Sequence, residues 1–372
     1  MSSEIELDKY VRSKQLELSS TLATRKAIYL DIKFWIILRD VVKGLRNAPA
    51  EIALISLLRE GADKGRIFCP ISDSTFGELL KKADVKSREV TADLIDDLSL
   101  GVTLIPYDLR AGTELAHFLH SAITPNEVLP LDQLVWSKLS YVMGFVHPRG
   151  TPFDPAAELT MQKMFLDHMW TLSMREIVDR IGDRALPNPE RFDALAERLN
   201  KLNTEHAGEL RSFAQAYENE VHGILDIFIE VAIDIVSQMV QAKHGGGHQL
   251  SPEQRKEEGR QLHSLLFAAF KKGRAEDALP SLHIPASLHA AIRWNRQQRL
   301  KTNDFLDFEH ATAALGYCDA FFTERPLRAL ATASHIALDR RYGCDVAASP
   351  EEAVTYLRTI LDRADKEPER PA

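Results

Sequence analysis

The chain has 372 residues, of which 45% are hydrophobic and 27% are charged, with 18 glycines and 17 prolines. This composition is that of an ordinary globular protein and excludes collagen-like and disordered chains. The net charge of −8 excludes a protein that wraps nucleic acid through overall positive charge, so any contact with phosphates has to come from a local basic patch. The length suggests about two structural units.

Cysteine usage and hydropathy predict a cytoplasmic protein with no membrane segment. The N-terminal residues are rich in acids and lack the basic start and apolar run of a signal peptide. The most apolar stretch, 221–242, is interrupted every fourth residue by Asp226, Glu230 and Asp234, which predicts a helix with one polar stripe. Three cysteines without CxxC spacing favour neither a disulfide framework nor a zinc site. They are Cys69, Cys318 and Cys344.

Strand and helix patterns alternate after a helical or loose lead-in at 1–25, as in a parallel sheet covered by helices. The expected strands are 27–32, 66–71 and 102–106. The helices expected between them are 33–45, 49–63, 72–84 and 88–98.

From 111 to 298 the pattern becomes helical with almost no strand signal. The run from Lys243 to His248 contains three glycines and predicts a loop rather than a metal site. The helices expected here are 111–123, 130–145, 155–182, 189–242 with a break near Thr204 or Gly223, 252–274 and 284–300. Helices at 304–315, 326–334 and 350–364 and strands at 317–323 and 344–348 are expected after them.

The organisation expected from these patterns is an α/β domain interrupted by a large all-helical insertion. The α/β domain comprises 26–108 and 302–349, which together have an ordinary single-domain length. The insertion is 109–301, and 350–372 forms a C-terminal helix and tail.

Acidic residues stand at the positions where such a sheet collects ligands, the carboxyl ends of its strands. Asp31 ends the first strand, and Glu324 follows the strand at 317–323. Glu78 lies on the helix after the second strand. Asp304 and Asp307 are three residues apart and share a helix face.

Carboxylates that converge in this way repel one another unless a cation neutralises them. A set of oxygen ligands selects Mg²⁺ or Mn²⁺ over zinc. Such ions bind a scissile phosphate and lower the pKa of an attacking water, so the pattern predicts metal-assisted phosphoryl chemistry.

Four segments of the sequence resemble the PIN-domain nucleases. They are Ala27-Ile-Tyr-Leu-Asp31, Ser72-Asp-Ser-Thr-Phe-Gly-Glu78, Asp307-Phe-Glu-His-Ala-Thr-Ala-Ala314 and Phe321-Phe-Thr-Glu324. The resemblance covers about 131 of the 372 residues and implies a PIN-like fold and a metal-dependent endonuclease, most often acting on RNA rather than DNA.

The resemblance implies that Asp31, Glu78 and Asp307 are metal ligands and catalytic residues. Asp304 and Glu324 are further candidate ligands, although family members often carry Asp where this chain has Glu324. Ser72, Thr323, Asn303 and Asp319 are the candidates for side chains around the ligands. Asp319 ranks below Glu324, because it opens its strand and should lie at the far edge.

Four basic residues precede the acidic helix, in a stretch without acids from 278 to 303. They predict a basic helical stripe beside Trp294 that leads phosphates to the metal, although a solvated helix face has the same appearance. They are Arg293, Arg296, Arg299 and Lys301.

Two alternatives to a nuclease remain open. A catalytically inactive PIN-like module would bind nucleic acid or a protein, and the insertion would then serve a protein partner or a homo-oligomer. In a helical interaction protein the acids would be structural: Asp31 and Asp304 would cap helices, and His310 would be a packing residue.

Overall fold

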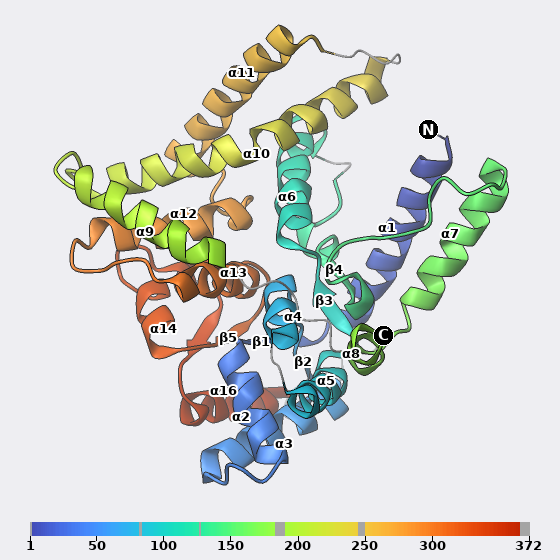
Figure 1. The fold of residues 1–372 in the computed structure, drawn as a ribbon, viewed down its shortest axis with the longest axis vertical. Coiled ribbons are helices and arrows are strands. Elements are labelled where there is room, and N and C mark those ends of the chain that lie inside the picture. The colour runs from blue at the N-terminus through green and yellow to red at the C-terminus, as the bar shows by residue number, and fades with distance from the viewer. Residues whose placement is uncertain (1, 82–83, 126–127, 183–189, 245–249, 365–372) are drawn as a thin grey trace.

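A small parallel sheet forms the centre of the protein in the computed structural model, which describes residues 2–81, 84–125, 128–182, 190–244 and 250–364 (Figure 1). The strands are β1 (Lys26–Leu30), β2 (Ile67–Phe68), β5 (Ala320–Phe322) and β6 (Asp345–Ala347), in the order β2-β1-β5-β6. All three pairings are parallel, with Leu30 opposite Phe322 and Phe322 opposite Ala347. The expected α/β architecture is therefore confirmed.

Side chains alternate between the two faces of this sheet, as the period of a strand requires. Ile28, Leu30 and Phe322 pack against α2 (Ile32–Val42), α3 (Pro49–Asp63), α5 (Val85–Ser99) and α16 (Pro350–Ala364). Tyr29 and Phe321 face the opposite layer, which includes α12 (Pro280–Trp294), α13 (Thr302–Tyr317) and α14 (Arg325–Ala331). The central strands are thus buried on both faces, which explains their continuous apolar sequences.

A second, antiparallel sheet corrects the expectation of an all-helical insertion with a helix at 130–145. Here β3 (Val102–Leu104) pairs with β4 (Trp136–Lys138), and a bridge from Thr103 to Ile71 joins β3 to the chain just after β2. The short 3-10 helices η2 (Leu131–Gln133) and η3 (Leu139–Tyr141) flank β4. Trp136 is buried against Phe68, with ring centroids 5.4 Å apart, so tertiary packing selects the strand.

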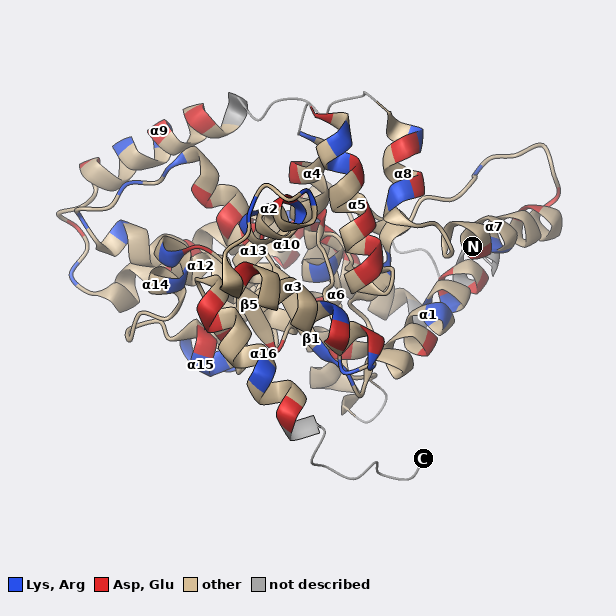
Figure 2. Ribbon diagram, turned by 90° about the horizontal axis from the view of Figure 1, so that it is seen from below, with Lys and Arg blue, Asp and Glu red and all other residues tan. Residues whose placement is uncertain are grey.

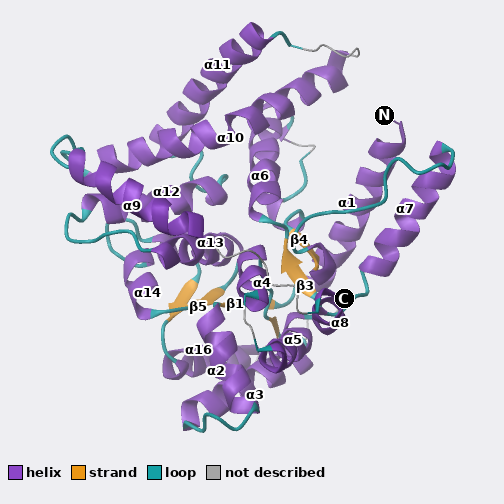
Figure 3. Ribbon diagram, viewed as in Figure 1, coloured by secondary structure: helices purple, strands orange, loops and turns teal. Residues whose placement is uncertain are grey.

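Long helices form the rest of the molecule and extend away from the sheet (Figure 3). A separate apolar core joins α6 (Tyr107–Ile123), α10 (Phe213–His244), α11 (Pro252–Lys271) and α12. The expected break near Thr204 is confirmed, because α9 (Glu190–Glu205) ends there, while residues 245–249 of the expected glycine loop lie outside the described residues. The other helices are α1 (Ser2–Leu22), α4 (Asp73–Leu80), α7 (Pro155–Met169), α8 (Met174–Ile181) and α15 (Leu338–Tyr342). Within the described chain, no helix is both long and apolar enough to cross a bilayer.

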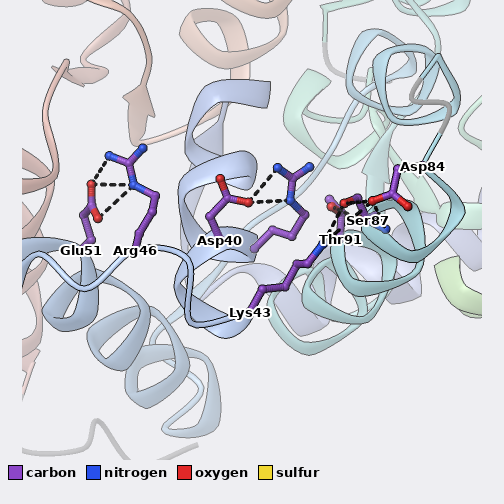
Figure 4. Close-up of polar contacts among 8 residues, drawn as sticks. Asp40, Lys43, Arg46, Glu51, Asp84, Ser87 and Thr91 are labelled. Carbon is purple, nitrogen blue, oxygen red and sulfur yellow. Dashed lines mark hydrogen bonds and ion pairs between the residues drawn. The ribbon is translucent and has the colours of Figure 1, made fainter.

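The end of α2 is tied to its neighbours by polar contacts (Figure 4). Lys43 donates to Ser87 Oγ over 3.1 Å, and Arg46 pairs with Glu51 at the start of α3. The helix stops at Val42, shorter than expected, because Gly44 takes up a left-handed conformation with φ of +70°. These contacts fix the helix that begins at Asp31.

A cluster of buried polar side chains joins α6 and α12 to α13. The carboxylate of Glu114, on α6, accepts hydrogen bonds from Ser281 N over 2.9 Å, from Ser281 Oγ over 2.5 Å and from the Tyr317 hydroxyl. Arg110 donates to Ser281 Oγ over 3.2 Å. Burial raises the pKa of Glu114 to about 7, although these donors oppose the shift. The cluster therefore places a group that titrates near neutrality between α6, α12 and α13.

Candidate functional site

Asp31 lies at the carboxyl end of β1, where the sheet gives way to α2. Its N–H donates to Phe322 O over 3.0 Å, which holds it beside the end of β5. Its carboxylate accepts from Phe34 N over 3.2 Å, so Asp31 is also the N-cap of α2. The residue is 5% exposed, and burial raises its pKa to about 6 against the opposing effects of Thr323 and His310. Asp31 therefore caps α2, and its carboxyl group is poorly solvated, which disfavours the ionised form.

Asp307 on α13 is the second acid of this edge. Burial is the main cause that raises its pKa to about 7; His310 opposes this shift, and the negative charges of Asp31, Glu324 and Asp304 contribute to it. The electrostatic influence of Asp31 and Glu324 on Asp307 indicates that the end of β1, the end of β5 and the first turns of α13 lie on the same side of the sheet. We call Asp31, Asp307 and Glu324 the acidic edge.

Glu324 is the most open member of the acidic edge. It occupies the N-cap position of α14 with no capping hydrogen bond from its side chain, and it is exposed. Thr323, directly before it, is fully buried, and its hydroxyl makes no hydrogen bond of normal geometry within the described structure. That hydroxyl lies close enough to Asp31 to lower the pKa of the carboxyl group. The hydroxyl of Thr323 therefore faces the Asp31 carboxyl group and favours its ionised form.

Glu78 is connected to the acidic edge through His310 rather than directly. His310 Nε2 lies 2.7 Å from Glu78 Oε2, and His310 Nδ1 lies 2.7 Å from the Tyr29 hydroxyl. That hydroxyl in turn contacts Ser72 Oγ at 2.6 Å and Thr75 Oγ1 at 3.0 Å. An ionised carboxylate only accepts, so Nε2 carries the hydrogen that faces Glu78. The network fixes the ring and thereby the orientation of Glu78.

His310 supplies positive charge beside the acids. Burial lowers its pKa, but the hydrogen bond to Glu78 and the charges of Asp31 and Asp307 outweigh this effect and raise the pKa above its ordinary value. The sequence offered only a weak indication of this role, since His310 follows Asp307 by three residues. Tyr29 was missed, because a tyrosine within an apolar strand looks like an ordinary core residue.

Three further site candidates, Asp304, Asn303 and Asp319, lie in different surroundings. Asp304 accepts from Lys301 N over 2.8 Å, so it caps α13 as well as influencing Asp307. Asn303 is exposed in the first turn of α13. Asp319 does not belong to the site: it accepts from Lys26 Nζ over 2.6 Å and from Ala27 N over 2.8 Å at the start of β1. Because it precedes β5, it lies at the opposite edge of the parallel sheet.

The expected basic helical stripe is wrong, because α12 ends at Trp294 and the following residues form a loop. Arg293 is engaged with Glu220 over 2.9 Å, which links α12 to α10. Arg296 donates to Ala207 O over 2.9 Å. Arg299 and Lys301 are exposed and form no ion pair within the described part of the chain. The positive charge is therefore present but is carried by the loop 295–301.

The donor set fits a hard divalent cation in its chemistry, although the ligands are not gathered tightly. The buried Asp31, the partly buried Asp307, the exposed Glu324 and the hydroxyl of Thr323 all offer oxygen atoms. Among the residues that the structure describes, no group of three or more His, Cys, Asp or Glu is close enough to hold a metal ion as placed. A bound cation would have to draw the exposed Glu324 inward.

Comparisons with known proteins do not identify the chain. No family model, no curated protein and no solved structure matches it.

Proposed function

We propose that the protein is a divalent-metal-dependent phosphodiesterase, an endoribonuclease of the PIN type. The observation that carries this proposal is the pair Asp31 and Asp307, two largely buried carboxyl groups at the carboxyl edge of a parallel sheet whose pKa values are raised to about 6 and about 7. A bound cation would stabilise the ionised form of both groups, which supports a metal site at this position.

Asp31, Asp307 and Glu324 would hold the ion, which we expect to be Mg²⁺ or Mn²⁺. When bound, it would neutralise the phosphate and lower the pKa of a water molecule. Asp31 is fixed by its cap to α2 and Asp307 by α13. His310 holds Glu78 beside them, so this carboxylate is oriented to join the ligands or to accept the proton of the attacking water.

Cleavage of single-stranded RNA tests the proposal. We expect Mn²⁺ to support cleavage by the wild type and Asp31→Asn to abolish it, because the amide keeps the helix cap but loses the charge. Asp319→Asn is the matched control, since it removes a carboxylate from the opposite edge of the same sheet. Equal activity of Asp31→Asn and the wild type would refute the proposal.

The melting temperature with and without Mn²⁺ shows whether a variant has lost the metal site or the fold. A ligand at 100 times its Kd stabilises a folded protein by about 2.7 kcal/mol. Mn²⁺ should therefore raise the Tm of the wild type and of Asp319→Asn but not that of Asp31→Asn.

A second candidate is a catalytically inactive module that binds nucleic acid or a protein. The exposure of Glu324 and the looseness of the ligand set favour it. It predicts RNA binding without cleavage in any divalent ion. For either candidate we propose a cytoplasmic location, which three buried cysteines in the free thiol form support.

A further inference from the structure

Beside the acidic edge, the loop 295–301 separates two recesses of the surface. The first, of about 640 Å³, is lined by Trp294, Gln297, Gln298, Leu330 and His335 among others. The second, of about 660 Å³, is lined by Arg299, Lys201 and Asn200. We call the first the Trp294 recess and the second the Arg299 recess. The two differ in chemistry, since the first offers an aromatic ring and amides and the second combines cations with the acids Glu197 and Glu205.

We infer that the Trp294 recess binds an unstacked base of single-stranded nucleic acid while the Arg299 recess holds its backbone. This inference rests on the proposed function, because it extends the substrate path of the same site. An aromatic ring on which a base can stack, next to cations that follow the phosphates, is the combination by which proteins bind single strands.

Trp294 lines the recess and is 38% exposed although it is large and apolar, so part of its side chain is open to a ligand. Gln297 and Gln298 are exposed and carry amide groups that can donate to and accept from the edge of a base. His335 forms another wall, and its ring is held by an edge contact with Phe213 at 4.8 Å between centroids. The recess thus offers one flat apolar surface and polar groups around it.

The loop between the recesses is held in place rather than free. The side chain of Asn200, on α9, donates to Leu300 O over 2.8 Å and accepts from Leu300 N over 2.9 Å. Arg296 is anchored to Ala207 O. A fixed loop keeps its cations at a constant distance from Trp294, which favours binding because less conformational entropy is lost.

Cations and acids are mixed on this part of the surface. Figure 2 shows Lys and Arg as well as Asp and Glu on α9, and Lys and Arg on the loop beside it. Arg299 is exposed, while Lys201 lies 3.9 Å from Glu205 in an open ion pair. Glu197 and Glu205 also line the Arg299 recess, so the cations are interspersed with acids. Such a surface favours contact with a few phosphates rather than strong binding of any polyanion.

The Trp294 recess lies next to the acidic edge. Pro326, in the first turn of α14, lines the recess and is two residues after Glu324. Two residues of chain span at most roughly 7 Å. A base in the recess would therefore belong to a nucleotide close to Glu324.

Binding of fluorescein-labelled single-stranded RNA in EDTA, which prevents cleavage, tests the inference. Trp294→Ala should weaken binding roughly 5- to 150-fold, as loss of one stacked base does, and Trp294→Tyr should restore most of it. Ile227→Ala is the matched control, because Ile227 is an exposed apolar residue on α10. RNA should also quench a part of the tryptophan fluorescence that is missing from Trp294→Tyr.

The outcomes separate this inference from the proposed function. Unchanged affinity of Trp294→Ala, or equally tight binding of duplex RNA, would overturn the Trp294 recess as a base site even if the protein cleaves RNA. Trp294-dependent binding by a protein that never cleaves would retain the site and reject the nuclease. Single-stranded DNA in parallel shows which sugar is preferred, and Trp294-dependence with either sugar supports the inference.

Discussion

Replacing Glu114 by glutamine should change how the stability of the protein depends on pH. Glu114 is fully buried, and its pKa is raised from 4.5 to about 7. Between these two values the folded protein binds more protons at this position than the unfolded chain does. The free energy of unfolding therefore falls as the pH rises through this window. Since one unit of pKa corresponds to about 1.4 kcal/mol, Glu114 should account for a loss of roughly 3 kcal/mol.

Urea unfolding of the wild type and of Glu114→Gln at several pH values between 4 and 8 measures this loss. The variant should have a nearly constant penalty of about 1–3 kcal/mol, because an amide offers one acceptor oxygen where the carboxylate offers two, and the hydroxyls of Ser281 and Tyr317 both donate to one of these oxygens. The stability of the wild type should approach that of the variant as the pH rises. The other buried acids titrate in both proteins, so their effects cancel in the difference.

Glu352→Gln is a control, because the pKa of Glu352 is shifted in the opposite direction from that of Glu114. The hydrogen bond from Ala348 N lowers the pKa of Glu352, and the side chain of Arg328 lowers it further. The stabilisation from Glu352 is fully present above the pKa that this residue has in the unfolded chain. It is lost only as the pH falls through the lower pKa of the folded protein, so the difference in unfolding free energy between wild type and Glu352→Gln should be flat from pH 5 to 7. A difference between wild type and Glu114→Gln that is equally flat would refute the assignment of a raised pKa to the buried cluster.

Two further substitutions address the acidic edge and the basic residues. Tyr29→Phe removes the hydroxyl that holds His310, and we expect Mn²⁺ affinity measured by calorimetry to fall about 10- to 100-fold with little change in RNA binding; unchanged metal affinity would show that the network does not position Glu78. Arg293→Met breaks the pair with Glu220 and leaves that carboxylate without its partner. This substitution should lower the free energy of unfolding in urea by about 1–3 kcal/mol. The salt dependence of RNA binding should remain that of the wild type. A reduced salt dependence would show that Arg293 contacts RNA rather than only pairing with Glu220.

The central strands, and the positions of Asp31 and Glu324 at their ends, could be predicted because the signals are local. The apolar run before Asp31 and the one before Thr323 are each long enough to identify a buried strand, and the rule that ligands collect at carboxyl ends then selects Asp31 and Glu324. The position of Asp307 follows from helix spacing after Asp304.

Features that depend on distant partners could not be predicted. β4 is three residues long and pairs with β3, more than thirty residues earlier in the chain. The loop 295–301 contains two arginines and three glutamines or asparagines with no glycine or proline, so propensity alone favours continuing the helix. The helix α12 nevertheless ends at Trp294, and the loop that follows is held by the hydrogen bond from Asn200 of α9 to Leu300 O. The link from Tyr29 to Glu78 likewise joins residues that only the fold brings together.

The close contact between α12 and α13 has a consequence for how the molecule unfolds. A side-chain carbon at Gly316 would lie 3.2 Å from Pro280 Cβ, and Tyr317 is held to Glu114 one residue later. The same helix carries Asp307 and His310 two to three turns earlier. Heating cannot release the long helices while leaving the sheet and its acids intact, so calorimetry should record one cooperative melting event for the whole chain instead of two.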